Sequence, residues 1–272
     1  MEKIIISFFI ILSTISANAS ETASTIFNKY SSSVVYIETK FGMGTGFLVS
    51  NNVIVTNRHV VFGLNVEKNS WNAPQKIWLN KGKELAAFNY MVCSMRVDIC
   101  ILGVNSNYKL SKKSNLTSNS VTPGEDVYII GHPSGISVPI ISTGIISSEI
   151  NNFVWEDIRG EKATFQGFTS TAAISSGSSG SPVMSKKGEI LGIAVGYYKE
   201  AQNLNFIIST SEINLLIKNV YDKKNKEFAY LKNGFDIEFE QNTKMIKPAI
   251  KNSGIDIKPN SNSYSMARAV LK

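Results

Sequence analysis

The sequence predicts a mainly β protein that ends in one short helix and a small tail. Short runs of β-branched and aliphatic residues, such as 53–55 and 189–195, are separated by turns rich in Asn, Gly and Ser, a pattern typical of strands. Residues 209–220 have helical periodicity, and 227–240 alternate as a β-hairpin does. With 272 residues, 43% of them hydrophobic and 18% charged, the chain can bury a large core in one or two units.

A serine-rich loop between two predicted strands is the first candidate functional feature. It contains Gly177-Ser178-Ser179-Gly180-Ser181-Pro182. A tight turn of this kind can hold a serine hydroxyl clear of the backbone and aim two N–H groups at one point, as acyl transfer requires. By composition alone, the loop is equally consistent with a flexible linker. Only Ser179 has glycine both two residues before it and one residue after it, so it is the candidate nucleophile.

A histidine and an aspartate precede this loop in positions that suit catalysis. His59 follows the predicted strand 53–56, and Asp98 heads the apolar strand 98–102. A serine nucleophile, a histidine base and an orienting acid form a catalytic triad, and their order along the chain separates its convergent versions. The alternatives are a structural histidine and an aspartate that only caps its strand. The second histidine, His132, lies in a Gly-His-Pro turn and is interpreted as structural.

These segments resemble the trypsin-like serine proteases, most closely the bacterial HtrA (Do-like) protease domain. The resemblance covers roughly residues 34–218 and implies a chymotrypsin-like fold of two six-stranded antiparallel β-barrels. The first barrel would span about 34–115 and the second about 121–218, with the triad in the cleft between them. The matching segments, in family order, are 44–47, 56–61, 98–102, 131–135, 142–147, 172–174 with 177–182, and 188–193.

The resemblance also implies a role for each residue of the site. Ser179 would attack the peptide carbonyl, His59 would take and return the proton, and Asp98 would orient His59. The N–H groups of Gly177 and Ser179 would form the oxyanion hole. We therefore expect a serine endopeptidase acting on polypeptides, including unfolded proteins. The alternative is a non-catalytic peptide-binding or chaperone-like module on the same fold, against which the intact triad and the retained Gly177 argue.

The specificity pocket expected from the family is apolar. Ala173 stands where enzymes that cut after Lys or Arg have an aspartate, and Ala194 stands where glutamyl endopeptidases have a histidine. A charged substrate side chain would then be buried without a partner, which is costly. We expect the substrate-binding residues Ala173, Ile193, Ala194 and Ile207 to favour aliphatic P1 residues. Ser178 replaces the aspartate used by the zymogen switch of digestive relatives, so that switch is not expected here.

The N-terminus has the pattern of a secretory signal peptide. Met1-Glu2-Lys3 is followed by an apolar run at 4–15 and by Ala17-Asn18-Ala19, which predicts a signal peptide at 1–19 with cleavage after Ala19. The apolar run is too short for a stable membrane span, and no other segment comes close to that length. We therefore expect a mature chain from Ser20, periplasmic or secreted, without a transmembrane segment.

The two cysteines leave a disulfide as an open question. Cys93 and Cys100 fall opposite each other if residues 95–98 turn a hairpin, and export permits oxidation. Hairpin geometry nevertheless often refuses a bridge. Two cysteines and two dispersed histidines show no zinc spacing, so we expect no metal and no cofactor.

The C-terminal part of the chain begins with a helix signal. Ser209-Thr210-Ser211-Glu212 is a capping box, and Ile213, Leu216, Ile217 and Val220 then share one apolar face. This predicts the end of a peptidase domain that spans 20–218. In the extension 219–272, the turn Asn233-Gly234 predicts a hairpin at 227–240 that docks on the barrels. Residues 241–272 are expected to be disordered or to form a short helix, and the extension is too short for a PDZ domain.

The net charge of +7 is concentrated in the tail. From Lys218 onward there are eleven Lys or Arg against six Asp or Glu, a net charge of +5. No nucleic-acid motif accompanies this surplus, so nucleic acid is not an expected partner. A solvated basic tail is the simpler interpretation, and a weak contact with an anionic surface is the alternative. The sequence leaves the oligomeric state open.

Overall fold

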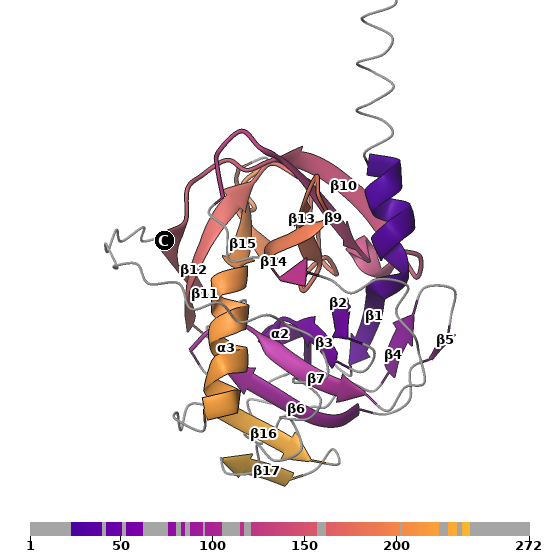
Figure 1. The fold of residues 1–272 in the computed structure, drawn as a ribbon, viewed down its shortest axis with the longest axis vertical. Helices are drawn as coiled ribbons and strands as arrows, with labels where there is room; N and C mark the ends of the chain where they lie inside the picture. The colour runs from indigo at the N-terminus through magenta and orange to yellow at the C-terminus, as the bar shows by residue number, and fades with distance from the viewer. Residues whose placement is uncertain are drawn as a thin grey trace, which may run out of the picture.

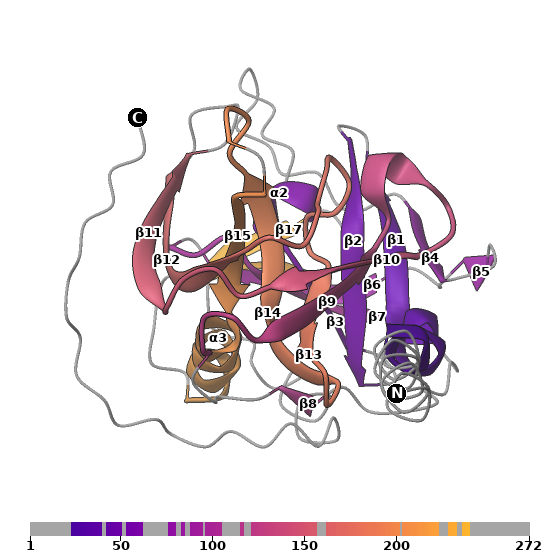
Figure 2. The same cartoon turned by 90° about the horizontal axis from the view of Figure 1, so that it is seen from above.

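A computed structural model shows two β-sheets that lie side by side, with a helix running along them (Figures 1 and 2). The expectation of a mainly β protein with two antiparallel sheets is confirmed. The signal peptide expected at 1–19 and the basic end at 241–272 lie outside the described residues. The structure describes residues 23–39, 42–50, 53–61, 76–79, 83–84, 88–94, 96–104, 115–116, 121–156, 162–201, 203–222, 228–232 and 236–239.

The first sheet has nine strands in the order β17-β16-β6-β7-β3-β2-β1-β4-β5, and each neighbouring pair is antiparallel. It is larger than the six strands expected, because a C-terminal hairpin and the short β5 extend its two ends. Its strands are β1 (Val34–Thr39), β2 (Gly42–Ser50), β3 (Val53–Thr56), β4 (Lys76–Leu79), β5 (Lys83–Glu84), β6 (Phe88–Ser94), β7 (Cys100–Val104), β16 (Phe228–Lys232) and β17 (Asp236–Phe239).

The second sheet follows the path β10-β9-β13-β14-β15-β12-β11, and β8 (Asn115–Leu116) pairs in parallel with β14. A bridge between Ile146 and Ser170 joins the end of β10 to β12, so six of these strands form a ring of neighbours at that end, with β11 outside it. The strands are β9 (Asp126–Gly131), β10 (Ile140–Ile145), β11 (Asn151–Glu156), β12 (Lys162–Ser170), β13 (Pro182–Ser185), β14 (Glu189–Tyr197) and β15 (Asn205–Ser209).

Apolar side chains from both sheets form one large core cluster. Val55 and Ile101 of the first sheet join Ile130 and Phe165 of the second in this cluster, and all are nearly fully buried. Burial of aliphatic and aromatic side chains is the main favourable term in folding. The two sheets therefore share a core that fixes one against the other.

The expected C-terminal helix is α3 (Thr210–Asp222), which extends from β15 towards β16 (Figure 1). Its predicted apolar face is confirmed for Ile213, Leu216 and Ile217, which are buried in the large cluster. The capping box is different from the prediction. The carboxylate of Glu212 does not turn back to Ser209 but accepts hydrogen bonds from the Arg96 side chain and from the N–H of Gln166.

A helix at residues 23–30 was not predicted from the sequence. Its Ile26 and Tyr30 are buried in the large cluster. Ala23, Ile26, Phe27 and Tyr30 lie at i, i+3, i+4 and i+7, so the sequence does contain the periodicity of this helix. Across the described residues, no helix has the length and apolarity needed to cross a bilayer.

The question of the cysteines is answered by the β6–β7 hairpin. Cys93 lies directly opposite Cys100 in the register of these strands, and the two form a disulfide. The connecting turn contains Asp98, so the covalent link closes the hairpin immediately beside the predicted triad acid.

The C-terminal hairpin extends the first sheet. β16 pairs antiparallel with β17 and, on its other side, with β6. The Asn233-Gly234 turn lies outside the described residues. Main-chain pairing with β6 supplies the third strand that an isolated hairpin lacks, and it covers an edge that would otherwise present unpaired N–H and C=O groups.

We predict that truncation after Lys226 lowers Tm, because it removes β16 and leaves the β6 edge unpaired. For a protein of this size, Tm should fall by about 2–4 °C for each kcal/mol of stability lost. Truncation after Glu240 retains both strands and serves as the matched control. Differential scanning calorimetry measures both changes, and equal Tm values for the two truncated proteins would contradict the docking of the hairpin.

Candidate active site

His59 and Asp98 meet because their strands are neighbours. His59 lies in the single helical turn α2 (Arg58–Val61), directly after β3, and Asp98 lies in the turn before β7. The pairing of Thr56 with Cys100 sets the register of β3 and β7. His59 Nδ1 is 2.5 Å from Asp98 Oδ2, and the His59 backbone N–H donates to Asp98 Oδ1 at 2.8 Å. The structure thus brings together two of the three predicted triad residues.

The Asp98 carboxyl group is buried, with 2% of its surface exposed. Burial raises the pKa of Asp98, but the charge of His59, its two hydrogen bonds and the charge of Arg58 outweigh this effect, so that the pKa lies below its ordinary value. An ionised Asp98 accepts the Nδ1–H of His59, so Nε2 is the ring nitrogen that remains for another partner. His59 is partly exposed, at 25% of its side chain, so a substrate can reach Nε2.

Ser179 lies on a loop that depends on two glycines. Gly177 and Gly180 have φ values of 89° and 86°, a left-handed conformation that side chains disfavour. Ser178, between them, is buried, and its hydroxyl accepts the N–H of Ser175 at 3.1 Å. The position that carries an aspartate in digestive relatives is therefore satisfied within the loop itself.

The loop leaves the two expected oxyanion donors free. The carbonyl of Ser176 accepts the N–H of Ser134 at 2.5 Å, and in a trans peptide the following N–H, that of Gly177, points the opposite way. Within the described part of the chain, neither Gly177 nor Ser179 donates its N–H to a hydrogen bond. Two unengaged N–H groups on one tight loop are what an oxyanion hole requires.

Thr45 ties this loop to the first sheet. Its backbone N–H donates to the carbonyl of Ser179 at 2.8 Å, and its hydroxyl donates to the carbonyl of Gly177 at 2.8 Å. The same hydroxyl accepts the N–H of His132 at 2.9 Å. Sequence reasoning treated Thr45 only as part of a matching segment. The signal in the sequence is a threonine between two glycines, Gly44 and Gly46, which allow other backbone segments to approach closely.

The Ser179 hydroxyl is hydrogen-bonded to the backbone of β14 in this structure. It donates to the carbonyl of Val195 on β14 at 3.2 Å. The next residue, Gly180, packs against the Thr45 carbonyl and the Thr56 hydroxyl, and Thr56 ends the strand that leads to His59. The nucleophile loop thus lies beside that strand end. Catalytic hydrogen bonds are often absent before substrate binds, and a rotation of the Ser179 side chain redirects the hydroxyl.

Of the four predicted pocket residues, the structure groups only some. Ala194 and Ile207 are direct partners across β14 and β15 and share one buried cluster, against which Ile174 packs. Ala173 is exposed beside this cluster, and its carbonyl accepts the Ser142 hydroxyl at 2.7 Å. Ile193 is a correction, because it is buried in the other cluster. Successive side chains of a strand face opposite sides of the sheet, so Ile193 and Ala194 cannot line one wall.

His132 has the structural environment that the sequence suggested. It is fully buried, its Nδ1 lies 2.8 Å from the Ile136 carbonyl, and its ring meets Tyr36 edge-on with centroids 5.6 Å apart. Burial lowers the pKa of His132, and the hydrogen bond to Ile136 only partly opposes this effect. Among the described residues, no group of three or more metal-binding side chains is arranged to hold a metal ion.

The comparison with protein families agrees with this geometry. The profile of the trypsin-like peptidase domain matches residues 44–193, which is more than half of the chain and includes His59, Asp98 and Ser179. The chain belongs to this family. The expected resemblance to trypsin-like proteases and to their HtrA branch is thereby confirmed.

Two curated members of the HtrA branch show the extent of the likeness. The putative serine protease HhoB of Synechocystis is 28% identical over 191 residues, which is 70% of this chain and 43% of the relative. The serine protease HTRA3 of Rattus norvegicus is 28% identical over 186 residues, which is 68% of this chain and 39% of the relative. The chain thus spans less than half the length of either relative.

Solved structures show the same fold. The crystal structure of Deg5 is 25% identical, with a TM-score of 0.58, over 72% of this chain and 91% of that one. The inactive form of the protein Rv3671c of Mycobacterium tuberculosis, in a Ser343Ala mutant, is 21% identical, with a TM-score of 0.60, over 74% of this chain and 92% of that one. At this identity the second likeness concerns the fold alone.

Thr45→Val is expected to lower kcat/KM of peptide hydrolysis by this trypsin-like domain, because it leaves the Gly177 carbonyl and the His132 N–H without their buried partner. We expect kcat/KM to fall by about 10-fold to 100-fold, which is the cost of leaving at least one of these two buried groups unsatisfied. Thr45→Ser retains the hydroxyl and should restore most of the rate. The control is Thr169→Val. It removes a hydroxyl of β12 that is hydrogen-bonded to the hydroxyl of Ser147. Equal kinetics for Thr45→Val and Thr169→Val would contradict this prediction.

The pKa of His132 also predicts a pH dependence of stability. Because the folded protein lowers this pKa, the unfolded chain binds more protons below about pH 6.5, and the free energy of unfolding should decrease as pH falls through that value. His132→Asn keeps a side-chain donor for the Ile136 carbonyl and removes the titration. Urea unfolding at about pH 7.5 and about pH 5.5 should therefore show a smaller decrease for the variant than for the wild type. An unchanged decrease would show that His132 is not responsible.

Proposed function

We propose that this chain is a serine endopeptidase that hydrolyses peptide bonds through an acyl-enzyme on Ser179. The observation that carries the proposal is the buried Asp98 carboxylate, which binds both the ring and the backbone N–H of His59. A buried carboxylate needs donors to remain ionised, and here the donors belong to one histidine that faces solvent. Membership of the trypsin-like family supports the same chemistry.

The mechanism begins with proton transfer. When substrate binds, the Ser179 side chain rotates from the Val195 carbonyl towards His59, whose Nε2 takes the hydroxyl proton as Oγ attacks the scissile carbonyl. The negative oxygen that forms is stabilised by the N–H groups of Gly177 and Ser179. His59, now a cation beside Asp98, gives its proton to the leaving amine. Water then attacks the acyl carbon and gives a proton to His59, which returns it to Ser179 Oγ as the bond to the acyl group breaks and the acid product leaves.

A short stretch of β14 offers a place for the substrate backbone. Gly192 and Ile193 are not available for this, because they are paired with β13 on one side and β15 on the other. Among the residues that the structure describes, β13 pairs no farther than Ile193, and β15 is the strand that pairs with the segment 195–197, so one side of this segment has no strand partner there. An extended peptide can add there as a strand, next to the nucleophile loop that Val195 contacts.

The pocket proposed for the P1 side chain is lined by Ala173, Ala194 and Ile207. Small apolar groups form this wall, and Asn205 fixes its backbone by donating to the carbonyls of Ser170 and Ala172 at 3.1 and 2.8 Å. The side chains that surround Ala194 and Ile207 in their cluster are apolar. Aliphatic P1 residues therefore fit, whereas a charged P1 side chain would lose its hydration without gaining a partner.

The cellular setting of this proposal is outside the cytosol. A signal peptide at 1–19 would export the chain, and the disulfide between Cys93 and Cys100 is the kind of bond that persists in oxidising compartments. The substrates would be polypeptides, including unfolded proteins. The basic tail remains a candidate for weak contact with anionic surfaces, which added salt would weaken.

A fluorophosphonate probe should label the mature protein at Ser179, because the reagent reports an activated serine hydroxyl. Ser179→Ala should abolish labelling and lower casein cleavage by several orders of magnitude, while circular dichroism remains that of the folded protein. Ser176→Ala, a neighbouring serine in the same loop, should retain labelling. Casein cleavage that persists in Ser179→Ala would refute the mechanism, and binding of unfolded casein without cleavage by the wild type would indicate a chaperone-like module instead.

A peptide library should reveal cleavage after Val, Ala, Ile or Leu in preference to Lys, Arg or Glu. An unpaired charge buried at Ala194 and Ile207 should lower kcat/KM by roughly 100-fold or more. Ala173→Asp should bring in cleavage after Lys or Arg, because it supplies the missing carboxylate. A dominant Arg or Glu signal from the wild type would mean that another set of residues forms the pocket.

A further inference from the structure

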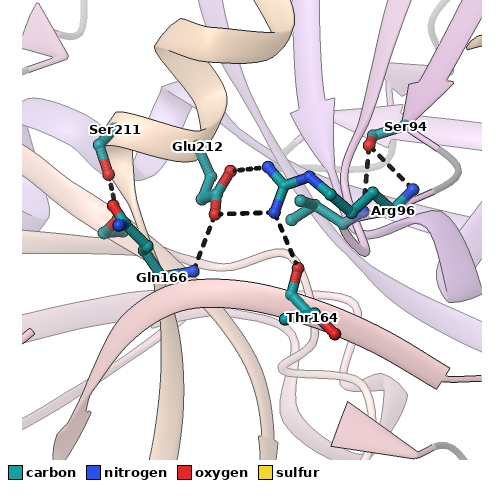
Figure 3. Close-up of polar contacts among 8 residues, drawn as sticks. Ser94, Arg96, Thr164, Gln166, Ser211 and Glu212 are labelled. Atoms are coloured by element: carbon teal, nitrogen blue, oxygen red, sulfur yellow. Dashed lines mark hydrogen bonds and ion pairs between the residues drawn. The ribbon is translucent and has the colours of Figure 1, made fainter. Parts of the chain in front are cut away.

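An ion pair joins the two sheets close to Asp98. Arg96 lies in the turn between β6 and β7, and Glu212 lies in the first turn of α3 (Figure 3). Arg96 Nη2 is 2.6 Å from Glu212 Oε2, and Arg96 Nη1 is 3.4 Å from Glu212 Oε1. The Arg96 side chain is 43% exposed, but Glu212 is almost fully buried at 5%. The pair thus has one end in solvent and the other in the protein interior.

The strand β12 takes part in the same network. The N–H of Thr164 donates to the Arg96 carbonyl at 3.1 Å, and Arg96 Nη1 donates to the Thr164 carbonyl at 3.2 Å. The N–H of Gln166 donates to Glu212 Oε1 at 2.8 Å. A turn of the first sheet is therefore bound to strand β12 of the second sheet and to helix α3, which follows β15 (Figure 3).

The turn itself is rigid on its own side. The Ser94 hydroxyl accepts the N–H groups of Arg96 and Val97 at 3.3 and 3.0 Å, as Figure 3 shows for Ser94 and Arg96. Asn57 donates its side-chain amide to the Asp98 carbonyl at 2.8 Å. With these hydrogen bonds in place, we expect a displacement of Arg96 to move Asp98, which lies two residues farther along the chain.

We propose that Arg96 and Glu212 are positioning residues for the reaction, acting through Asp98 and His59. This inference rests on the proposed function. His59 and Asp98 belong to the first sheet and Ser179 to the second, so their alignment depends on contacts between the sheets. Thr45 supplies one such contact at the nucleophile loop, and the Arg96–Glu212 pair supplies another at the turn of the triad acid. Removal of either partner leaves the other charge without its match and lets the Asp98 turn shift relative to Ser179.

The test uses Arg96→Lys, which keeps the charge but not the two-point contact, and Glu212→Gln, which keeps the shape but not the charge. Glu189→Gln is the matched control, because the Glu189 side chain accepts a hydrogen bond from Ser185 on the same sheet. We expect kcat per fluorophosphonate-labelled site to fall by about 10-fold to 100-fold in both variants, as for a displacement of about 1 Å, with little change in KM. The double variant should be no slower than the slower single variant, since the two residues act as one unit.

A second readout does not require peptidase activity. The proton shared by His59 Nδ1 and Asp98 gives a far-downfield NMR resonance, which should move or broaden in both variants and stay in place in Glu189→Gln. If the wild type shows the resonance and the variants lose it, but no protein cleaves peptides, the positioning role stands and the proposed function fails. Wild-type kcat per labelled site with an unmoved resonance would overturn the inference. Failure of both variants to fold would also overturn it, because the pair would then serve folding alone.

Discussion

The buried carboxylate of Asp98 is the constraint around which the rest of the site is arranged. A charge with almost no contact with water is stable only if donors replace the lost hydration, and His59 supplies two of them. The register of β3 and β7 meets this requirement, because it brings α2, which follows β3, next to the turn that precedes β7. It also explains why the turn is fixed on several sides, by Asn57, by Ser94 and by the Cys93–Cys100 disulfide.

The second constraint is that the reacting groups come from two different sheets. A shared apolar core holds the sheets together, but apolar contacts are not directional and do not by themselves set a position to a fraction of an ångström. Directional contacts supply that accuracy at two places. Thr45 binds the nucleophile loop through its N–H and its hydroxyl, and Arg96 binds β12 and α3.

The nucleophile loop shows how a neutral side chain can replace a charged switch. In digestive relatives, a carboxylate before the nucleophile pairs with the N-terminus that activation cleavage creates. Here the Ser178 hydroxyl accepts the N–H of the nearby Ser175 instead. The loop is then stabilised by bonds within itself and to the turn at Ser134. Such a loop needs no distant cation to hold its shape, which is consistent with an enzyme whose oxyanion donors are in place once the chain has folded.

Local sequence patterns were enough to propose the triad residues and to predict the apolar face of α3 and the mainly β character of the chain, because each depends on spacing along the chain or on strand and helix periodicity. What only the tertiary structure decided depends on contacts between distant segments. Ile193 and Ala194 lie on opposite faces of β14, and each face packs into a different apolar cluster. Glu212 forms an ion pair with Arg96, 116 positions away in the sequence, instead of a capping box. Thr45 is hydrogen-bonded to Gly177, 132 positions away. No periodicity records such pairs, since a side chain chooses the partner that its three-dimensional surroundings provide and not the one that its neighbours in sequence suggest.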